Sequence, residues 1–253
     1  MEKKSNISKG MDIQKELFSE KESKVKKYQK LVIGETGSWS LIKYELITMF
    51  SLWIPGALGL LLRSILYPKL LKYCGRNVVF GMNVVLRHPN KIVIGDNVVI
   101  DDHCVLDAKG ENNQGIVIGN NVYIGRNSII YCQNGDIHIG DNGNISSNCQ
   151  IFSAKNVSIG KYLLMGSYSY LVGGGHVYDS IEIPIIEQGR IAKGITLGND
   201  IWVGAGVKVL DGVTIEEGAI IGPGSVVNKH VPKYNIVAGV PAKIIFNRER
   251  RGQ

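Results

Sequence analysis

The stretch from Leu197 to Pro232, LGNDIWVGAGVKVLDGVTIEEGAIIGPGSVVNKHVP, decides the fold. Cut into sixes, it reads LGNDIW, VGAGVK, VLDGVT, IEEGAI, IGPGSV and VNKHVP. Every block opens with an aliphatic residue, and three of the six carry glycine second. A period of six matches neither a helix nor an ordinary strand and is typical of a parallel β-helix. Each block is interpreted as a short strand whose aliphatic residue faces into a coil, with small or turn-forming residues at the corner.

The same repeat continues upstream in four further blocks: IGDNVV at Ile94, IGNNVY at Ile118, IGDNGN at Ile139 and IGKYLL at Ile159. Successive starts, continued through Leu197 and Ile215, are 24, 21, 20, 38 and 18 residues apart. Three hexads make one triangular coil, so the excesses are predicted to be loops at the corners. Only one of these loops, between Ile159 and Leu197, is long. The repeat therefore predicts a mainly β protein.

The composition, with 44% hydrophobic residues, 20% charged residues and 31 glycines, is that of a globular chain with many corners. We predict one solenoid with an N-terminal extension. The expected divisions are a charged tail over 1–37, a hydrophobic helical segment over 38–77, and the repeat domain over 78–253, with an acceptor loop at 177–194. Residues 1–30 contain nine lysines and few apolar residues, so this tail is expected to be solvated.

The cysteines point to a reducing compartment. No CxxC spacing occurs among the four, and no secretory signal precedes them, so small buried thiols in the cytoplasm are expected. They are Cys74, Cys104, Cys132 and Cys149.

The hydrophobic segment contains 17 residues without a charge, from Leu46 to Leu62, interrupted by Pro55-Gly56. A membrane-spanning helix needs roughly 20 apolar residues, so two short helices over about 38–54 and 57–73 are predicted instead. They either pack against the solenoid or a neighbouring subunit, or form a monotopic or re-entrant membrane anchor. The residues that a membrane interface would use are Tyr44, Trp53 and Tyr67, with Lys43, Arg63, Lys69 and Lys72. The net charge of +7 favours an anionic surface or ligand, and no interleaved aromatic and basic pattern indicates nucleic acid.

The hexads, together with WVGAGVKVLDGVTIEEGAIIGPGSVV and VAGVPAKII, resemble the hexapeptide-repeat acyltransferases. The closest branch is the maltose/galactoside O-acetyltransferases, and within it the enzymes that acetylate bacterial surface glycans. The resemblance covers about residues 78–248. It implies a left-handed β-helix, a homotrimer, and active sites between subunits that take acetyl-CoA.

Acyl transfer to a hydroxyl needs a general base near neutrality, which is usually histidine. His176 lies in LVGGGHVYDS at the mouth of the long insertion, and the family carries its base in a Gly-His at this place. The resemblance therefore assigns His176 as the base. The other four are expected to be satisfied histidines at the surface: His88, His103, His138 and His230.

The acceptor is expected to contact the long loop through Tyr178, Asp179, Glu187 and Arg190. Related galactoside enzymes carry an Asn-x-Asn about 30 residues before the histidine. This chain keeps the second, Asn148, and has Ser146 in place of the first.

The acetyl-CoA contacts follow from the same resemblance. Trp202 and Ala205 match a Trp-x-Gly-Ser/Ala turn, in which the Ala205 amide would bind the pantetheine arm. Gly222 and Pro223 occupy the matching corner of the next coil, and Asn228-Lys229 stands where relatives have Thr-Lys beside the adenine and phosphates. Lys243 and Arg248 would pair with phosphates. No second cofactor and no metal is expected.

The sequence thus predicts an acetyl-CoA-dependent O-acetyltransferase for a sugar hydroxyl of a cell-surface polysaccharide or lipid-linked glycan precursor. It would work in the cytoplasm at the inner face of the membrane. One alternative is N-acetylation of a nucleotide-linked amino sugar, and another is a non-catalytic scaffold. A γ-type carbonic anhydrase needs a close histidine pair, whereas the nearest two here, His88 and His103, are 15 residues apart.

Overall fold

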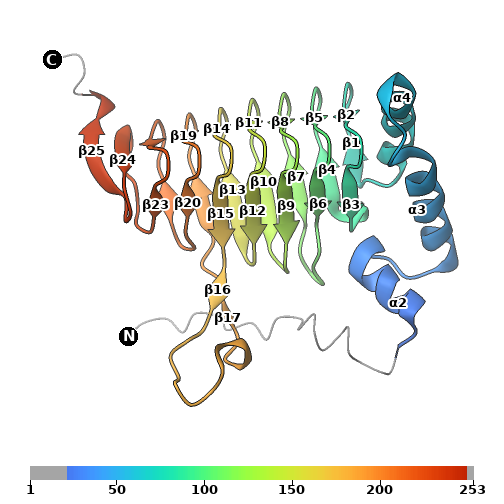
Figure 1. The fold of residues 1–253 in the computed structure, drawn as a ribbon, viewed down its shortest axis with the longest axis horizontal. Helices are drawn as coiled ribbons and strands as arrows, with labels where there is room; N and C mark the ends of the chain where they lie inside the picture. Colours follow the sequence, from blue (N-terminus) through green and yellow to red (C-terminus); the bar gives the residue numbers. More distant parts are fainter. Residues whose placement is uncertain (1–21, 250–253) are drawn as a thin grey trace.

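The computed structural model describes residues 22–249, in which a stack of short parallel strands is covered at one end by helices (Figure 1). The strands form three sheets of seven, nine and seven strands, joined by coils in the order first, second, third face. This is the parallel β-helix that the period of six predicted.

The first face contains β1 (Tyr73–Cys74), β4 (Ile92–Ile94), β7 (Ile116–Ile118), β10 (Asp136–Ile139), β13 (Asn156–Ile159), β18 (Ile195–Leu197) and β21 (Thr214–Ile215). The second face contains β2 (Val79–Phe80), β5 (Val99–Ile100), β8 (Tyr123–Ile124), β11 (Asn144–Ile145), β14 (Leu164–Met165), β19 (Trp202–Val203), β22 (Ile220–Ile221), β24 (Asn235–Ala238) and β25 (Lys243–Asn247). The third face contains β3 (Val85–Arg87), β6 (Val105–Asp107), β9 (Ile129–Cys132), β12 (Gln150–Ser153), β15 (Tyr170–Gly173), β20 (Lys208–Val209) and β23 (Val226–Val227).

The residues that open the hexads fill the interior. Their exposed fractions lie between 0% and 2%: Ile94, Ile118, Ile139, Ile159, Leu197 and Ile215. Full burial of such a side chain contributes about 1.5–3 kcal/mol to the stability of the folded state, and the repeat adds this contribution in every coil. Three of the four cysteines are buried free thiols, as expected: Cys104, Cys132 and Cys149.

The second position of the hexad is glycine because adjacent coils approach closely there. A Cβ placed on Gly140 would lie 2.6 Å from the backbone carbon of Gly160 in the next coil. Beside this corner runs a ladder of asparagines with left-handed backbone angles, in which each side chain donates to the next at 3.0–3.1 Å. The ladder contains Asn77, Asn97, Asn121 and Asn142. Asparagine tolerates this backbone better than most residues, which explains the recurring Asp-Asn and Asn-Asn pairs.

Helix α3 (Ser38–Ser51) lies inside the first predicted range, α4 (Gly56–Leu66) begins one residue before the second, and the short η2 (Tyr67–Lys69) leads into the coils. They are preceded by α2 (Lys24–Tyr28) and η1 (Gln29–Ile33). The break falls at Pro55, which stands just before α4. Within residues 22–249, no helix combines the length and apolar character needed to cross a bilayer. The coil stack starts slightly earlier than the predicted 78, because β1 already pairs with β4.

The helices supply hydrogen-bond donors to the carbonyls of the first coil. Backbone hydrogen bonds join each coil to the coils before and after it, whereas the first coil has no coil before it. Arg63 Nε donates to Phe80 O at 2.8 Å. The hydroxyls of Tyr67 and Tyr44 donate to the carbonyls of Val84 and Leu86 at 2.9 and 2.8 Å. Buried carbonyls without donors are costly, so these three side chains stabilise the first coil.

Placing Tyr44, Tyr67 and Arg63 at a membrane interface was therefore wrong, because all three are buried. Arg63 makes further contacts. Its side chain is 1% exposed, and its Nη1 also donates to Ser51 O and Ile54 O at 2.9 and 2.8 Å. These carbonyls stand at the end of α3, where a helix carries partial negative charge that favours a cation. Arg63 thus joins the end of α3 to the first coil.

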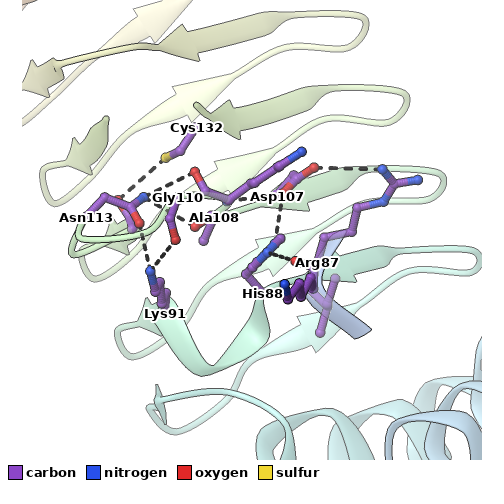
Figure 2. A network of polar contacts seen from close by, with 12 residues as sticks. Arg87, His88, Lys91, Asp107, Ala108, Gly110, Asn113 and Cys132 are labelled. Atoms are coloured by element: carbon purple, nitrogen blue, oxygen red, sulfur yellow. Dashed lines mark hydrogen bonds and ion pairs between the residues drawn. The ribbon is translucent and has the colours of Figure 1, made fainter. Parts of the chain in front are cut away.

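The described part of the charged tail is packed and not merely solvated. Gln29 and Ile33 are buried, and the Lys30 carbonyl accepts a 2.9 Å hydrogen bond from His88 Nε2. His88 is accordingly buried and not a surface histidine, and its Nδ1 lies 3.4 Å from Asp107 Oδ1 (Figure 2). This histidine holds η1 against the coils. Residues 1–21 lie outside the described residues.

The outward side of α3 and α4 is apolar. Its exposed residues, which we call the apolar surface, are Trp39, Ile42, Leu46, Met49, Phe50, Trp53, Leu58, Leu60, Leu61 and Ile65. On α4 the single charged side chain points inward, whereas Leu58, Leu60 and Leu61 point outward. This is the reverse of the usual arrangement in a water-exposed helix.

Candidate active site

The one long insertion forms a projecting hairpin beside the third face (Figure 1). Strand β16 (Gly175–His176) leaves the coil directly after β15 and pairs antiparallel with β17 (Arg190–Ile191). In this register His176 stands opposite Arg190, and directly opposite residues in such a pair have Cβ atoms about 4.5–5.5 Å apart. The structure therefore brings together two residues that the sequence had assigned to base and acceptor.

One guanidinium nitrogen of Arg190 lacks a hydrogen-bond acceptor in the described part of the chain. Its Nη1 is buried and has no hydrogen-bond partner among residues 22–249. A buried donor without a partner costs about 1–3 kcal/mol, more when charged. A water molecule, a bound acceptor or a second chain can supply the missing acceptor atom.

The loop between these strands is held by residues that the sequence did not indicate. Gln188 Oε1 accepts from Ser180 N at 2.9 Å, and its Nε2 donates to Ser180 O at 2.8 Å. At the loop end, Asp211 accepts from the backbone N–H groups of Lys193 and Gly194 at 2.7 and 2.8 Å. No spacing signal predicts these bonds, because they depend on how the insertion folds back.

The other predicted acceptor residues in the loop lie at its surface. Tyr178, Asp179 and Glu187 are exposed, and the short η4 (Ile185–Glu187) lies in the loop before β17. The loop also exposes four isoleucines, of which Ile181 is 97% exposed. Such apolar exposure around polar residues is typical of a surface that meets another molecule.

The outer side of the third face carries an aromatic group that the sequence analysis missed. Tyr131 stacks on Phe152 with ring centroids 4.8 Å apart, and its hydroxyl lies 2.7 Å from that of Tyr170. Burial, with the contact to Tyr170, raises the pKa of Tyr131 above its ordinary value. A Cβ on Gly174 would lie 3.2 Å from the Phe152 ring, so this group is adjacent to the strand that carries His176.

Ser146 and Asn148 do not join this group within one chain. They lie at the corner between the second and third faces, whereas His176 follows the corner between the third and first faces. The four residues of β12 separate the two corners by roughly 13 Å, at about 3.3 Å per residue.

The residues predicted to bind acetyl-CoA also lie at two different corners. Trp202, which is 51% exposed, and Ala205 lie near the corner between the second and third faces, as do Gly222 and Pro223. Asn228 and Lys229 are exposed at the corner between the third and first faces.

Several details bear on acetyl-CoA contact. The Ala205 N–H has no hydrogen-bond partner among the described residues, so it is available to a ligand. Lys243 is exposed on β25, whereas Arg248 Nη1 lies 3.5 Å from Asp200 Oδ2 and also donates to the Gly218 carbonyl. Arg248 is therefore already engaged.

The remaining histidines lie outside this region. His103 and His138 are exposed as expected, and His230 Nε2 lies 3.4 Å from Glu216 Oε1. In the part of the chain from 22 to 249, no three His, Cys, Asp or Glu side chains are grouped to hold a metal ion.

Comparison with known proteins agrees with this architecture. Residues 194–229 match the family described as Bacterial transferase hexapeptide (six repeats). The dTDP-4-amino-4,6-dideoxy-D-glucose acyltransferase of Escherichia coli is 32% identical over 181 residues, covering 71% of this chain and 84% of that protein. The chain belongs to the hexapeptide-repeat transferases.

Other relatives match over a shorter part of their length. The galactoside O-acetyltransferase of Escherichia coli is 31% identical over 51% of this chain, and a probable acetyltransferase of Mycobacterium tuberculosis is 35% identical over 52%. The chain spans 62% and 44% of those two proteins. A mutant of AntD, an N-acyltransferase from Bacillus cereus in complex with dTDP and coenzyme A, shares the fold, with 22% identity, a TM-score of 0.52, and coverage of 80% of this chain and 94% of that one.

Proposed function

We propose that this hexapeptide-repeat protein is an acetyl-CoA-dependent O-acetyltransferase for a sugar hydroxyl of a cell-surface polysaccharide or lipid-linked glycan precursor. The observation that carries the proposal is the hairpin that places an exposed His176 opposite Arg190 at the mouth of the long loop. The names of the relatives, which are sugar or nucleotide-sugar acyltransferases in two cases, support the substrate class.

In the proposed reaction, His176 takes the proton of the acceptor hydroxyl as its oxygen attacks the thioester carbonyl. The new C–O bond forms, a tetrahedral oxyanion follows, and backbone N–H groups stabilise its charge. The C–S bond then breaks, and the leaving thiolate takes the proton from the imidazolium. The free Ala205 N–H and the half-exposed Trp202 fit a pantetheine arm, and Lys229 fits a phosphate.

The acceptor would lie between the loop and the third face. Arg190 offers its unpartnered Nη1, and the stacked Tyr131 and Phe152 offer an aromatic surface of the kind on which sugars bind. Tyr178, Asp179 and Glu187 supply polar groups to hydroxyls.

The test is purified full-length protein with acetyl-CoA and a panel of free, nucleotide-linked and lipid-linked sugars, monitored by mass of the acceptor. His176→Ala should lower turnover by roughly 10²–10⁴, since a positioned general base supplies about that factor. His138→Ala, an exposed histidine on the first face, is the matched control and should retain turnover. Retention of turnover within a few-fold in His176→Ala would remove His176 from the mechanism.

N-acetylation of a nucleotide-linked amino sugar is the second candidate, favoured by the long match to the dTDP-amino-sugar acyltransferase. Mild alkali separates the two, because an acetyl ester is cleaved whereas an acetamide survives. No turnover with any acceptor would favour a non-catalytic scaffold.

We also propose a homotrimer with shared sites, because the candidate residues of one chain lie at two different corners. Trp202→Ala and His176→Ala each alter one part of the proposed shared site. The two variants should regain partial activity when unfolded and refolded together, since mixed trimers contain one intact site. Sedimentation of an active monomer would contradict this.

Finally, we propose that the apolar surface of α3 and α4 rests on the cytoplasmic face of the membrane. The ten exposed apolar residues and the inward-facing Arg63 support this position. Flotation with vesicles is the test, and Leu58→Ser with Leu61→Ser should abolish it.

A further inference from the structure

A cavity of about 260 Å³ lies between the start of α3, the chain after α4 and the short η3 (Pro89–Lys91). Three lysines from separate parts of the sequence line it: Lys43 on α3, Lys69 on η2, and Lys72 just before β1. We call this cavity the lysine pocket. It is remote from the hairpin that carries His176, because it lies at the helical end of the stack (Figure 1).

The charge in the lysine pocket is unbalanced. None of the three ammonium groups makes a hydrogen bond or ion pair with another residue in the range 22–249. One carboxylate, Glu35, also lines the cavity, and it accepts from the Ser40 hydroxyl at 3.0 Å. Three positive charges thus face one negative charge. A ligand with one or two negative charges would balance them.

Two lysines on the coils, by contrast, are paired with carboxylates of the chain. Lys161 Nζ lies 3.0 Å from Asp141 Oδ2, and Lys233 Nζ lies 3.2 Å from Glu217 Oε2.

The pocket adjoins the apolar surface. Trp39 lines the cavity and is also 75% exposed, and Ile42 precedes Lys43 on the exposed side of α3. Lysine ammonium groups above an apolar face, with tryptophan between them, are the arrangement found at membrane interfaces. The Asn90 Oδ1 at this cavity is buried without a hydrogen-bond partner among the described residues, so a headgroup hydroxyl would satisfy it.

We infer that the lysine pocket binds the phosphate of an anionic phospholipid headgroup while the apolar surface contacts the acyl chains. The inference rests on the proposed membrane position. It adds a ligand, a lipid phosphate, at a site separate from acetyl transfer. Phosphate is the shared chemistry, and the lipid is its source because the pocket opens beside an exposed apolar face.

The first experiment is flotation of the full-length protein with vesicles of phosphatidylcholine alone or with added phosphatidylglycerol. Each lysine near an anionic surface contributes about fivefold to binding, so the three together should give a preference of roughly 100-fold. The triple variant Lys43→Gln, Lys69→Gln, Lys72→Gln should lose this preference and retain binding to phosphatidylcholine. The matched control, Lys155→Gln, Lys161→Gln, Lys208→Gln, removes the same charge on the coils and should keep the preference.

The second experiment follows the fluorescence of Trp39 in a Trp53→Phe, Trp202→Phe background. Short-chain, soluble phosphatidylglycerol should change this signal saturably, and the lysine triple variant should remove the change. The same saturation by inorganic phosphate at equal concentration would overturn the lipid as source.

The outcomes separate the two proposals. If wild-type protein binds neither kind of vesicle, the membrane position itself is wrong. If it binds both equally, or if the lysine triple variant keeps the anionic preference with an unchanged unfolding midpoint, the lysine pocket is wrong. Acetyl transfer by the wild-type protein to a soluble sugar is measured apart from vesicles, so neither result depends on it.

Discussion

The coils and helix α4 are both rich in aliphatic residues. The coils point these side chains into the interior, whereas α4 points several of them toward the outside. In the coils, Ile100 and Ile124 are 0% exposed, because each inward side chain meets the coils on both sides. On α4, Leu58 and Leu61 are 61% and 56% exposed while Arg63 is 1% exposed. The coils bury aliphatic side chains, whereas α4 buries the guanidinium of Arg63, which donates to carbonyls at the end of the stack. The difference shows that backbone carbonyls in need of a donor at the end of the stack determined which side of α4 faces inward.

The largest expected effect is at this end. Arg63→Met removes the donor to the buried carbonyls of Phe80 and Ser51 and to the partly buried carbonyl of Ile54. Each buried carbonyl left unsatisfied costs about 1–3 kcal/mol, so the free energy of unfolding should fall by about 2–6 kcal/mol. Arg76→Met is the control, because Arg76 is an exposed residue paired with Asp96. Urea unfolding measures both. A midpoint in Arg63→Met equal to that of the control would show that α4 is not held by its buried cation.

The next comparison replaces one aliphatic residue in the coils and one on α4 by alanine. Ile124→Ala should lower the free energy of unfolding by about 2–5 kcal/mol, since a cavity remains in a packed coil. Leu61→Ala should change it by no more than about 0.5 kcal/mol, because the side chain is exposed. It should instead weaken flotation with vesicles. Equal losses of stability for the two variants would mean that the apolar surface is covered within the chain.

Alkaline unfolding tests the two tyrosine caps. Burial raises the pKa of Tyr44 and Tyr67 to about 12 in the folded protein, above the ordinary value near 10. Their stabilising contribution is present below pH 10 and is lost as pH rises from about 10 to 12, at about 1.4 kcal/mol per unit for each tyrosine. Tyr67→Phe should flatten this fall in chemical unfolding measured across that range.

Exposed Tyr73, replaced by phenylalanine, is the control and should leave the slope unchanged. A wild-type protein whose stability stays constant between pH 10 and 12 would contradict buried, donating hydroxyls.

The last prediction concerns the asparagine ladder on the outer surface of the coils. Asn121→Ala should cost about 1–2 kcal/mol, because alanine disfavours the left-handed backbone and removes two ladder bonds. Asn121→Gly keeps the backbone and should cost less. Equal values in thermal unfolding would show that the ladder, and not the backbone angle, supplies the energy at this corner.

Deleting the whole helical segment would not isolate its outer face, because the carbonyls of Phe80, Val84 and Leu86 would lose their donors. Point substitutions on the apolar surface are therefore the sharper test of membrane contact.

Much of the fold was predictable because its determinants are local and periodic. The hexad openers are buried, the long spacing is a projecting hairpin, and the break at Pro55 separates two helices. His176 and Arg190 were both named from the sequence, although nothing in it indicated that they would stand opposite each other. Gln188, Tyr131 and Phe152 were missed because their contacts join residues whose spacing carries no repeat.

The sequence by itself determined the parallel coil, since a period of six leaves only one way to bury its aliphatic side chains. It also determined where loops and helices begin, because glycine, asparagine and proline act through the local backbone. Only the tertiary structure decided that Arg63 and His88 lie inside, because Arg63 donates to the Phe80 carbonyl in the first coil and His88 contacts the Lys30 carbonyl in η1. It also decided that the candidate residues occupy two corners, because folding the chain into a prism separates positions on opposite sides of the third face.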